Sequence, residues 1–257
     1  MFNAPADGYD RLIGRYLPTL APVFADLVPV AAGMAVLDVG CGPGGLTTEL
    51  VSRVGAESVA AIDPSAPFVA ACRSRHPGVD VREGFAESLP WTDGSFDAVL
   101  ASLVVGFMND PVSGVSEMAR VAKPGATVAA CQWDRGGMKA LQIAGQAMVV
   151  HDSSLHEDLR KTGDTEGELA EVFRKAGLIE VEDGVLIAHA EYANFDDWWE
   201  PFTLGIGPHG AHLKTLDDEL REAIRLTCLG KFEEPDKPFT LEARAWFARG
   251  TVRAPGA

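Results

Sequence analysis

Short apolar runs alternate with helix-like amphipathic stretches along the first half of the chain. The runs that predict strands are 35–40, 58–63, 79–84, 96–105 and 125–133. Between them lie stretches with the apolar spacing and end signals of helices, at 45–55, 65–78 and from Pro111 to about residue 122. Asp110 should cap the last of these helices. Strands separated by helices require crossover connections, so they indicate a parallel sheet covered on both faces. We expect a Rossmann-like, doubly wound α/β fold.

After residue 133 the alternation stops. Residues 134–164 are irregular or helical, and we interpret them as an insertion. A helix that ends at Gly177 should follow, because Thr165 and Glu168 have the spacing of a capping box.

The last quarter of the chain predicts two more strands. One is 181–192, and the other is 239–252, where apolar and polar residues alternate. Two long, late strands side by side favour an antiparallel edge of the sheet. Between them, the aromatic-rich segment 193–237 should hold a helix that Thr215 can cap. With neither repeats nor a clear linker, residues 1–257 are predicted to form one domain with insertions.

Composition narrows the possible functions. The formal net charge is −15, and Lys and Arg form no run. Binding to nucleic acid or to an anionic membrane surface is therefore not expected, since both need clustered cations. No stretch of about 20 apolar residues is present to span a bilayer, and the N-terminus does not resemble a signal peptide.

The cysteines point to a reducing compartment. The chain has four, Cys41, Cys72, Cys131 and Cys228, and none has the spacing of a metal ligand or a redox pair. We expect buried free thiols, no metal site and a cytoplasmic location.

A glycine loop follows the first predicted strand. Gly40, Gly42 and Gly45 form G-x-G-x-x-G between a strand and a helix, and Asp63 ends the next strand. Such loops bind adenosine-containing cofactors. A nicotinamide dinucleotide would bring a pyrophosphate close to Asp38, which would repel it. S-adenosylmethionine has no phosphate and carries an ammonium that Asp38 could help to hold.

Further motifs occur in the same order as in a known family. They are VLDVGCGPGG (36–45), AIDPS (61–65), EGFAESLPW (83–91), GSFDAVLASLVVGFMNDP (94–111) and EMARVAKPGATVAA (117–130). Together they resemble class I S-adenosylmethionine-dependent methyltransferases of bacterial type, especially those similar to ubiquinone and menaquinone pathway enzymes. The matches cover 33–133, the expected cofactor-binding half, after a helical leader at 1–32. The resemblance implies a seven-stranded sheet whose last strand is antiparallel.

The resemblance also implies roles for the matching positions. Asp38, Gly40 and Gly42 would hold the methionine part of the cofactor. Asp63 would accept hydrogen bonds from the ribose hydroxyls.

Other matching positions would surround the adenine and the reacting methyl group. Pro64 and Ser65 would line the adenine, and the backbone N–H of Ala86 would meet its ring. Ser102 and Leu103, at the end of the fourth strand, would face the methyl donor.

Two features of the expected cofactor site are less regular. Phe85 replaces the aspartate usual in the third motif, so adenine recognition would fall to backbone groups or to Glu87. Residues 8–18 resemble a leader helix of many bacterial members. Tyr9 and Arg15 could close over the cofactor there, or they could be a packed tyrosine and a surface arginine.

The acceptor is the least defined partner. Methyl transfer is a direct displacement that positioning can catalyse, so no fixed catalytic residue is expected. The insertions 134–164 and 193–237 should form a helical lid over a small-molecule acceptor. His151, His209 and Trp199 are candidate substrate contacts, although such residues are more often structural. A nicotinamide oxidoreductase or a non-catalytic accessory or sensor protein stays the alternative, and the chain could be a monomer or a homodimer.

Overall fold

A single mixed sheet organises the chain. The computed structural model describes residues 6–151, 161–205 and 207–254. Seven strands pair in the order β3-β2-β1-β4-β5-β7-β6. They are β1 (Val36–Val39), β2 (Val59–Asp63), β3 (Asp80–Glu83), β4 (Phe96–Ser102), β5 (Ala122–Met138), β6 (Ile179–Tyr192) and β7 (Phe239–Thr251). The first five are parallel, and β7 runs antiparallel to both β5 and β6. The expected seven-stranded sheet with an antiparallel last strand is confirmed.

Helices cover both faces of the sheet. On one face, α2 (Leu17–Ala25) and α3 (Gly45–Val54) bury Leu20, Phe24 and Leu50 against the strands. On the other, α5 (Pro111–Val121) and α7 (Glu168–Lys175) do so through Met118 and Phe173. The helix α4 (Ala66–Arg75) packs near β2 and β3. This layering removes the apolar faces of the parallel strands from water.

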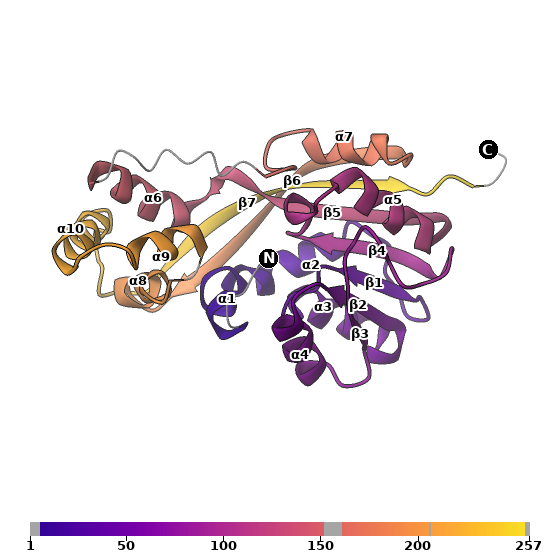
Figure 1. Cartoon of the computed structure of the whole chain (residues 1–257), viewed down its shortest axis with the longest axis horizontal. Helices are drawn as coiled ribbons and strands as arrows, with labels where there is room; N and C mark the ends of the chain where they lie inside the picture. The colour runs from indigo at the N-terminus through magenta and orange to yellow at the C-terminus, as the bar shows by residue number, and fades with distance from the viewer. Residues whose placement is uncertain (1–5, 152–160, 206, 255–257) are drawn as a thin grey trace.

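The long strands β6 and β7 extend beyond the layered part and carry the remaining helices (Figure 1). These are α6 (Lys139–His151), α8 (Phe195–Thr203), α9 (Gly207–Leu213) and α10 (Asp218–Leu229). The leader helix α1 (Ala6–Leu12) contacts α8 and α4, so it lies between this group and the layered part.

Some predicted element ends are wrong. The strand predicted to stop at residue 133 continues to Met138, with an irregularity in its pairing to β7 between Trp133 and Met138. The predicted capping box is absent. Gly167 precedes α7, and Glu168 Oε2 instead accepts from the Gly163 N–H at 3.0 Å.

A second predicted cap is also misplaced, whereas a third is confirmed. Asp217, not Thr215, caps α10, because its side chain accepts from the Leu220 N–H. Asp110 caps α5 as expected and accepts from two N–H groups, those of Val112 and Ser113. Carboxylates outcompete a neighbouring hydroxyl for such positions because they accept without a donor to satisfy.

Candidate functional site

A cavity of about 880 Å³ opens at the carboxyl ends of β1, β2 and β4. Ligands of open α/β sheets bind at this edge. The lining has two parts. The part next to the glycine loop comprises Gly40, Gly42, Asp63, Pro64, Ser65, Phe68, Phe85, Ala86, Glu87, Ser102 and Leu103. The part under the insertions includes Leu12, Trp133, Met138, Leu141, Gln142, Gln146, Val149, Lys161 and His209.

The glycine loop presents its backbone to the cavity. The N–H groups of Gly40 and Cys41 donate to the Ile62 carbonyl at 2.7 and 3.0 Å, which ties the loop to the end of β2. Gly40 has φ +72°, and a Cβ there would lie 2.3 Å from a Val104 methyl. Only glycine fits this backbone and this close approach.

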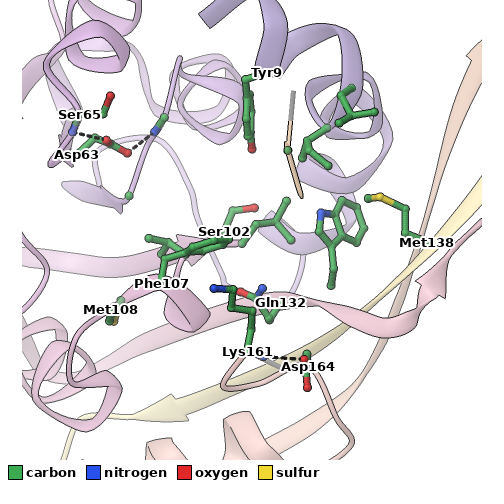
Figure 2. Close-up of a pocket in the computed structure, with 18 of the residues that line it drawn as sticks. Tyr9, Asp63, Ser65, Ser102, Phe107, Met108, Gln132, Met138, Lys161 and Asp164 are labelled. Carbon is green, nitrogen blue, oxygen red and sulfur yellow. Dashed lines mark hydrogen bonds between the residues drawn. The ribbon is translucent and has the colours of Figure 1, made fainter. Parts of the chain in front are cut away.

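Asp63 is organised by the same loop. Its two oxygens accept from the N–H groups of Gly42, at 2.9 Å, and Ser65, at 2.8 Å (Figure 2). Burial raises the pKa of Asp63, which those two hydrogen bonds partly oppose. Each oxygen keeps accepting capacity on the cavity side, as a contact with two ribose hydroxyls requires.

Asp38 lies fully buried beneath the loop. Its Oδ2 accepts from Thr47 Oγ1 at 2.6 Å, while its buried Oδ1 has no hydrogen-bond partner among the described residues. Burial raises the pKa of Asp38 to about 7. Asp38 also lines a small cavity of about 20 Å³, together with Gly40, Gly42 and Ser102. An unpaired carboxylate oxygen here suits a ligand ammonium and would oppose a phosphate.

The loop after β3 forms the part of the cavity where the sequence predicts the adenine. Phe85 is 47% exposed and lines the cavity, and the backbone of Ala86 lies beside it. Glu87 Oε1 accepts from the N–H groups of Asn109, at 2.7 Å, and Asp110, at 3.3 Å. Glu87 therefore links the loops after β3 and β4. To bind adenine as well, it would have to use its remaining accepting capacity.

The end of β4 is strained. Leu103 has φ +62°, rare for a residue with a side chain, and its N–H donates to the Cys131 carbonyl at 2.8 Å. Ser102 precedes it and also faces the cavity, with Oγ 3.6 Å from Cys131 Sγ. Strained backbone of this kind concentrates at binding sites.

The two leader residues, Tyr9 and Arg15, differ in their position relative to the cavity. Tyr9 lines the cavity, with its ring 5.6 Å from that of Phe68, and Figure 2 shows it pointing toward Ser102. Arg15 is absent from the lining. Its guanidinium forms a two-pronged ion pair with Asp197 on α8 and lies over the Tyr192 ring. To reach a cofactor carboxylate, Arg15 would have to break that pair.

The three candidate acceptor contacts also separate. His209 lines the cavity, and burial together with His212 lowers its pKa. His151 lies outside the lining, with Nε2 2.7 Å from Thr227 Oγ1. Trp199 is buried against Phe195 in the aromatic core of α8, so it serves the packing of the insertion.

Several cavity residues escaped the sequence analysis. Gln132 is the only strongly polar side chain in the apolar run from Ala126 to Trp133 within β5, and this exception could have marked it. Lys161, Arg135 and Met138 carry no such signal, because only the tertiary fold brings them to the cavity.

Neither a metal-binding cluster nor a membrane-spanning helix occurs among the described residues. Among residues 6–151, 161–205 and 207–254, no three His, Cys, Asp or Glu side chains are grouped so that they could hold a metal ion. No helix in the same ranges has the length and apolar character needed to cross a bilayer.

The sheet order and the loop geometry define a Rossmann-like α/β protein. Residues 37–130 match the family described as a methyltransferase domain. Over this segment, which is less than half of the chain, the protein is similar to methyltransferases.

Individual proteins extend this comparison. An uncharacterized methyltransferase of Mycobacterium tuberculosis is 37% identical over 124 residues, 48% of each chain. The demethylmenaquinone methyltransferase of Chlorobaculum parvum is 38% identical over 90 residues, 35% of this chain and 37% of that one. The protein thus spans about half the length, or less, of these relatives.

Solved structures share the fold over a longer stretch. The YcgJ protein of Bacillus subtilis superposes with a TM-score of 0.58 at 19% identity, covering 91% of this chain and 98% of that chain. A phosphoethanolamine N-methyltransferase of Haemonchus contortus, solved with S-adenosylhomocysteine, gives 0.57 at 17% identity over 96% of this chain and 56% of that one. At such identities the likeness concerns the fold.

Proposed function

We propose that this protein transfers a methyl group from S-adenosylmethionine to a small-molecule acceptor and releases S-adenosylhomocysteine. The observation that carries the proposal is a pair of buried acids beside the glycine loop, of which Asp63 lines the large cavity and Asp38 the small one. Asp63 is held with free accepting capacity, and Asp38 Oδ1 has no hydrogen-bond partner among the described residues. The first suits ribose hydroxyls and the second an ammonium, which are both groups of this cofactor.

The cofactor would supply an activated methyl group on a sulfonium, so the chain's own task is positioning and exclusion of water. Gly40, Gly42 and Asp38 would bind the methionine part, and Pro64, Ser65, Phe85 and Ala86 would surround the adenine. Ser102 and Leu103 would fix the direction in which the methyl group faces the acceptor. Tyr9 would close the cavity on the side opposite Lys161 and Gln132.

A small acceptor is favoured by the lining of the cavity and by the net charge of the chain. The helices α6 and α9 line the part of the cavity under the insertions. Such a roofed, mainly apolar space suits a small molecule. The net charge of −15 disfavours a nucleic-acid acceptor.

The alternative is a protein that binds a nucleotide cofactor without methyl transfer, either a nicotinamide oxidoreductase or an accessory protein. A dinucleotide would bring its pyrophosphate close to Asp38, whose Oδ1 has no described donor to offset the repulsion. We therefore favour S-adenosylmethionine.

Calorimetric titration with S-adenosylhomocysteine, and in parallel with NADH, tests the proposal. We expect micromolar binding of S-adenosylhomocysteine alone. Asp63→Ala should weaken it by roughly 100-fold or more, since each of the two expected hydrogen bonds from ribose hydroxyls to the charged carboxylate contributes about 1.5–3 kcal/mol. The exposed Asp236 gives a matched control, Asp236→Ala, which should bind like the wild type. Binding of NADH alone would refute the proposal.

A further inference from the structure

One cation in the cavity forms no ion pair with a carboxylate of the described residues. Lys161 lines the part under the insertions, and its Nζ lies 4.8 Å from the centre of the Phe107 ring. Among the described residues no Asp or Glu forms an ion pair with this ammonium. The chain has 37 acidic side chains and only 22 Lys and Arg. An unbalanced cation facing an internal space is therefore unexpected.

The other two charged side chains of the part under the insertions, Asp164 and Arg135, pair with each other. Asp164 is nearly buried and pairs with Arg135, whose Nη2 lies 2.9 Å from Asp164 Oδ1. Asp164 Oδ2 also accepts from the Lys161 backbone N–H at 2.8 Å, which fixes the turn but not the ammonium. Glu87 accepts from two backbone N–H groups in the loop after β4. Lys161 thus remains as the excess charge of this part.

Gln132 supplies a second donor beside Lys161. Its side chain is 4% exposed, and its Oε1 accepts from the Gly106 N–H at 3.4 Å. That contact assigns the Nε2 group to the other side, where no described residue accepts from it. A Cβ on Gly106 would lie 2.7 Å from Lys161 Cβ and 3.3 Å from Gln132 Cδ, so both side chains pack on this glycine. Figure 2 shows them on the side of the cavity opposite Tyr9.

The surroundings of these two donors are largely apolar. Trp133, Met138, Leu141 and Val149 line the same part of the cavity. A neutral acceptor that filled it would strip water from the ammonium without replacing the lost interaction, which is costly. An acceptor with its own negative charge would instead gain a charge-assisted hydrogen bond in a medium of low polarity.

We propose that Lys161 and Gln132 form a subsite for an anionic oxygen group, and that the acceptor is a small acid, typically a carboxylate, on an apolar body. This inference rests on the proposed function and narrows its substrate class. Lys161 would hold the anion through its charge, and the Gln132 amide would set the orientation.

Matched acid and amide probes test the subsite. The pairs are hexanoate and hexanamide, 3-phenylpropionate and 3-phenylpropanamide, and indole-3-acetate and indole-3-acetamide. Each is titrated into protein saturated with S-adenosylhomocysteine. We expect at least one acid to bind roughly 10- to 100-fold more tightly than its amide, the range given by one charged hydrogen bond.

Variants of Lys161 test whether this side chain causes the preference for an acid over its amide. Lys161→Met keeps the length and apolar stem of the side chain and should abolish the preference for the acid, whereas Lys161→Arg should retain much of it. Lys139 is exposed at the start of α6 and outside the lining, so Lys139→Met should behave like the wild type. Unchanged S-adenosylhomocysteine affinity in each variant would show that the fold is intact.

Two results would overturn the inference. One is that no acid exceeds its amide in the wild type, and the other is that the preference survives Lys161→Met. Failure to bind S-adenosylhomocysteine would instead count against the proposed function. The acid and amide titrations would then be made without it, and they would still report on Lys161.

Discussion

Replacing Asp38 by asparagine should change how the stability of the protein depends on pH. The carboxyl group is fully buried, and burial raises its pKa from 3.8 to about 7. In the unfolded chain the group regains its ordinary pKa. At a pH between these two pKa values, Asp38 in the folded state holds a proton that it has released in the unfolded state. The free energy of unfolding therefore falls as the pH rises through this window.

The size of the effect follows from the shift. One pKa unit corresponds to 1.36 kcal/mol, so a rise of about three units costs on the order of 4 kcal/mol once the pH exceeds 7. Between pH 5 and pH 8 the change amounts to about 2.5 kcal/mol. The asparagine side chain in Asp38→Asn would be neutral throughout and could still accept from Thr47 Oγ1, the present partner of Asp38 at 2.6 Å. The contribution of the asparagine to the free energy of unfolding should not vary with pH.

Urea unfolding of the ligand-free protein at pH 5 and pH 8 measures this difference. The gap in unfolding free energy between Asp38→Asn and the wild type should increase by about 2.5 kcal/mol in favour of the variant at the higher pH. The exposed Asp236→Asn serves as the control, because its gap should stay constant. An equal gap for Asp38→Asn at both pH values would refute the argument that its carboxyl group is desolvated.

Four further outcomes are expected. At pH 6, S-adenosylhomocysteine binding should release a proton, because a ligand ammonium favours the ionised form of Asp38; calorimetry in buffers of different ionisation enthalpy detects it, and Asp38→Asn should remove it. Phe85→Asp should tighten S-adenosylhomocysteine binding, because it restores the aspartate that is usual in the third motif. Calorimetry measures the change in affinity. Arg15→Ala should lower the free energy of unfolding by about 2 kcal/mol through loss of its pair with Asp197, while a large loss of cofactor affinity would instead assign Arg15 to the ligand. Gly106→Ala should weaken acid-probe binding more than S-adenosylhomocysteine binding, because the new methyl group displaces Lys161 and Gln132.

The layered part of the fold could be predicted from local pattern alone. Each early strand is a short apolar run ended by a turn, and each early helix has its own end signals, as Asp110 before α5 illustrates. The proposed cofactor positions also follow from sequence, because the glycine loop and the ends of β1 and β2 are fixed by their own strands. Asp38 and Asp63 come to the same edge since neighbouring parallel strands share it.

The part of the cavity under the insertions could not be predicted in this way. Its residues come from β5, α6, α9 and the turn at 161–164, and only tertiary packing brings them together. No sequence pattern separates His151 and Trp199 from His209, yet only His209 lines the cavity. Arg15 is similar, because no local pattern reveals that Asp197, far along the chain, would pair with it.

The distribution of charge in the cavity suggests how binding and release would be coupled. Asp63 lines the large cavity at the proposed cofactor end, and Asp38 lines the small cavity beside it. Lys161 lies at the end proposed to bind an anionic acceptor. If the anionic oxygen is itself the nucleophile, methyl transfer removes the positive charge of the sulfonium and the negative charge of the acceptor. A medium of low polarity favours this loss of charge. The methylated product would then leave Lys161 without a partner, as an amide probe does. The preference of the site for an acid over its amide would therefore also measure how readily the product leaves.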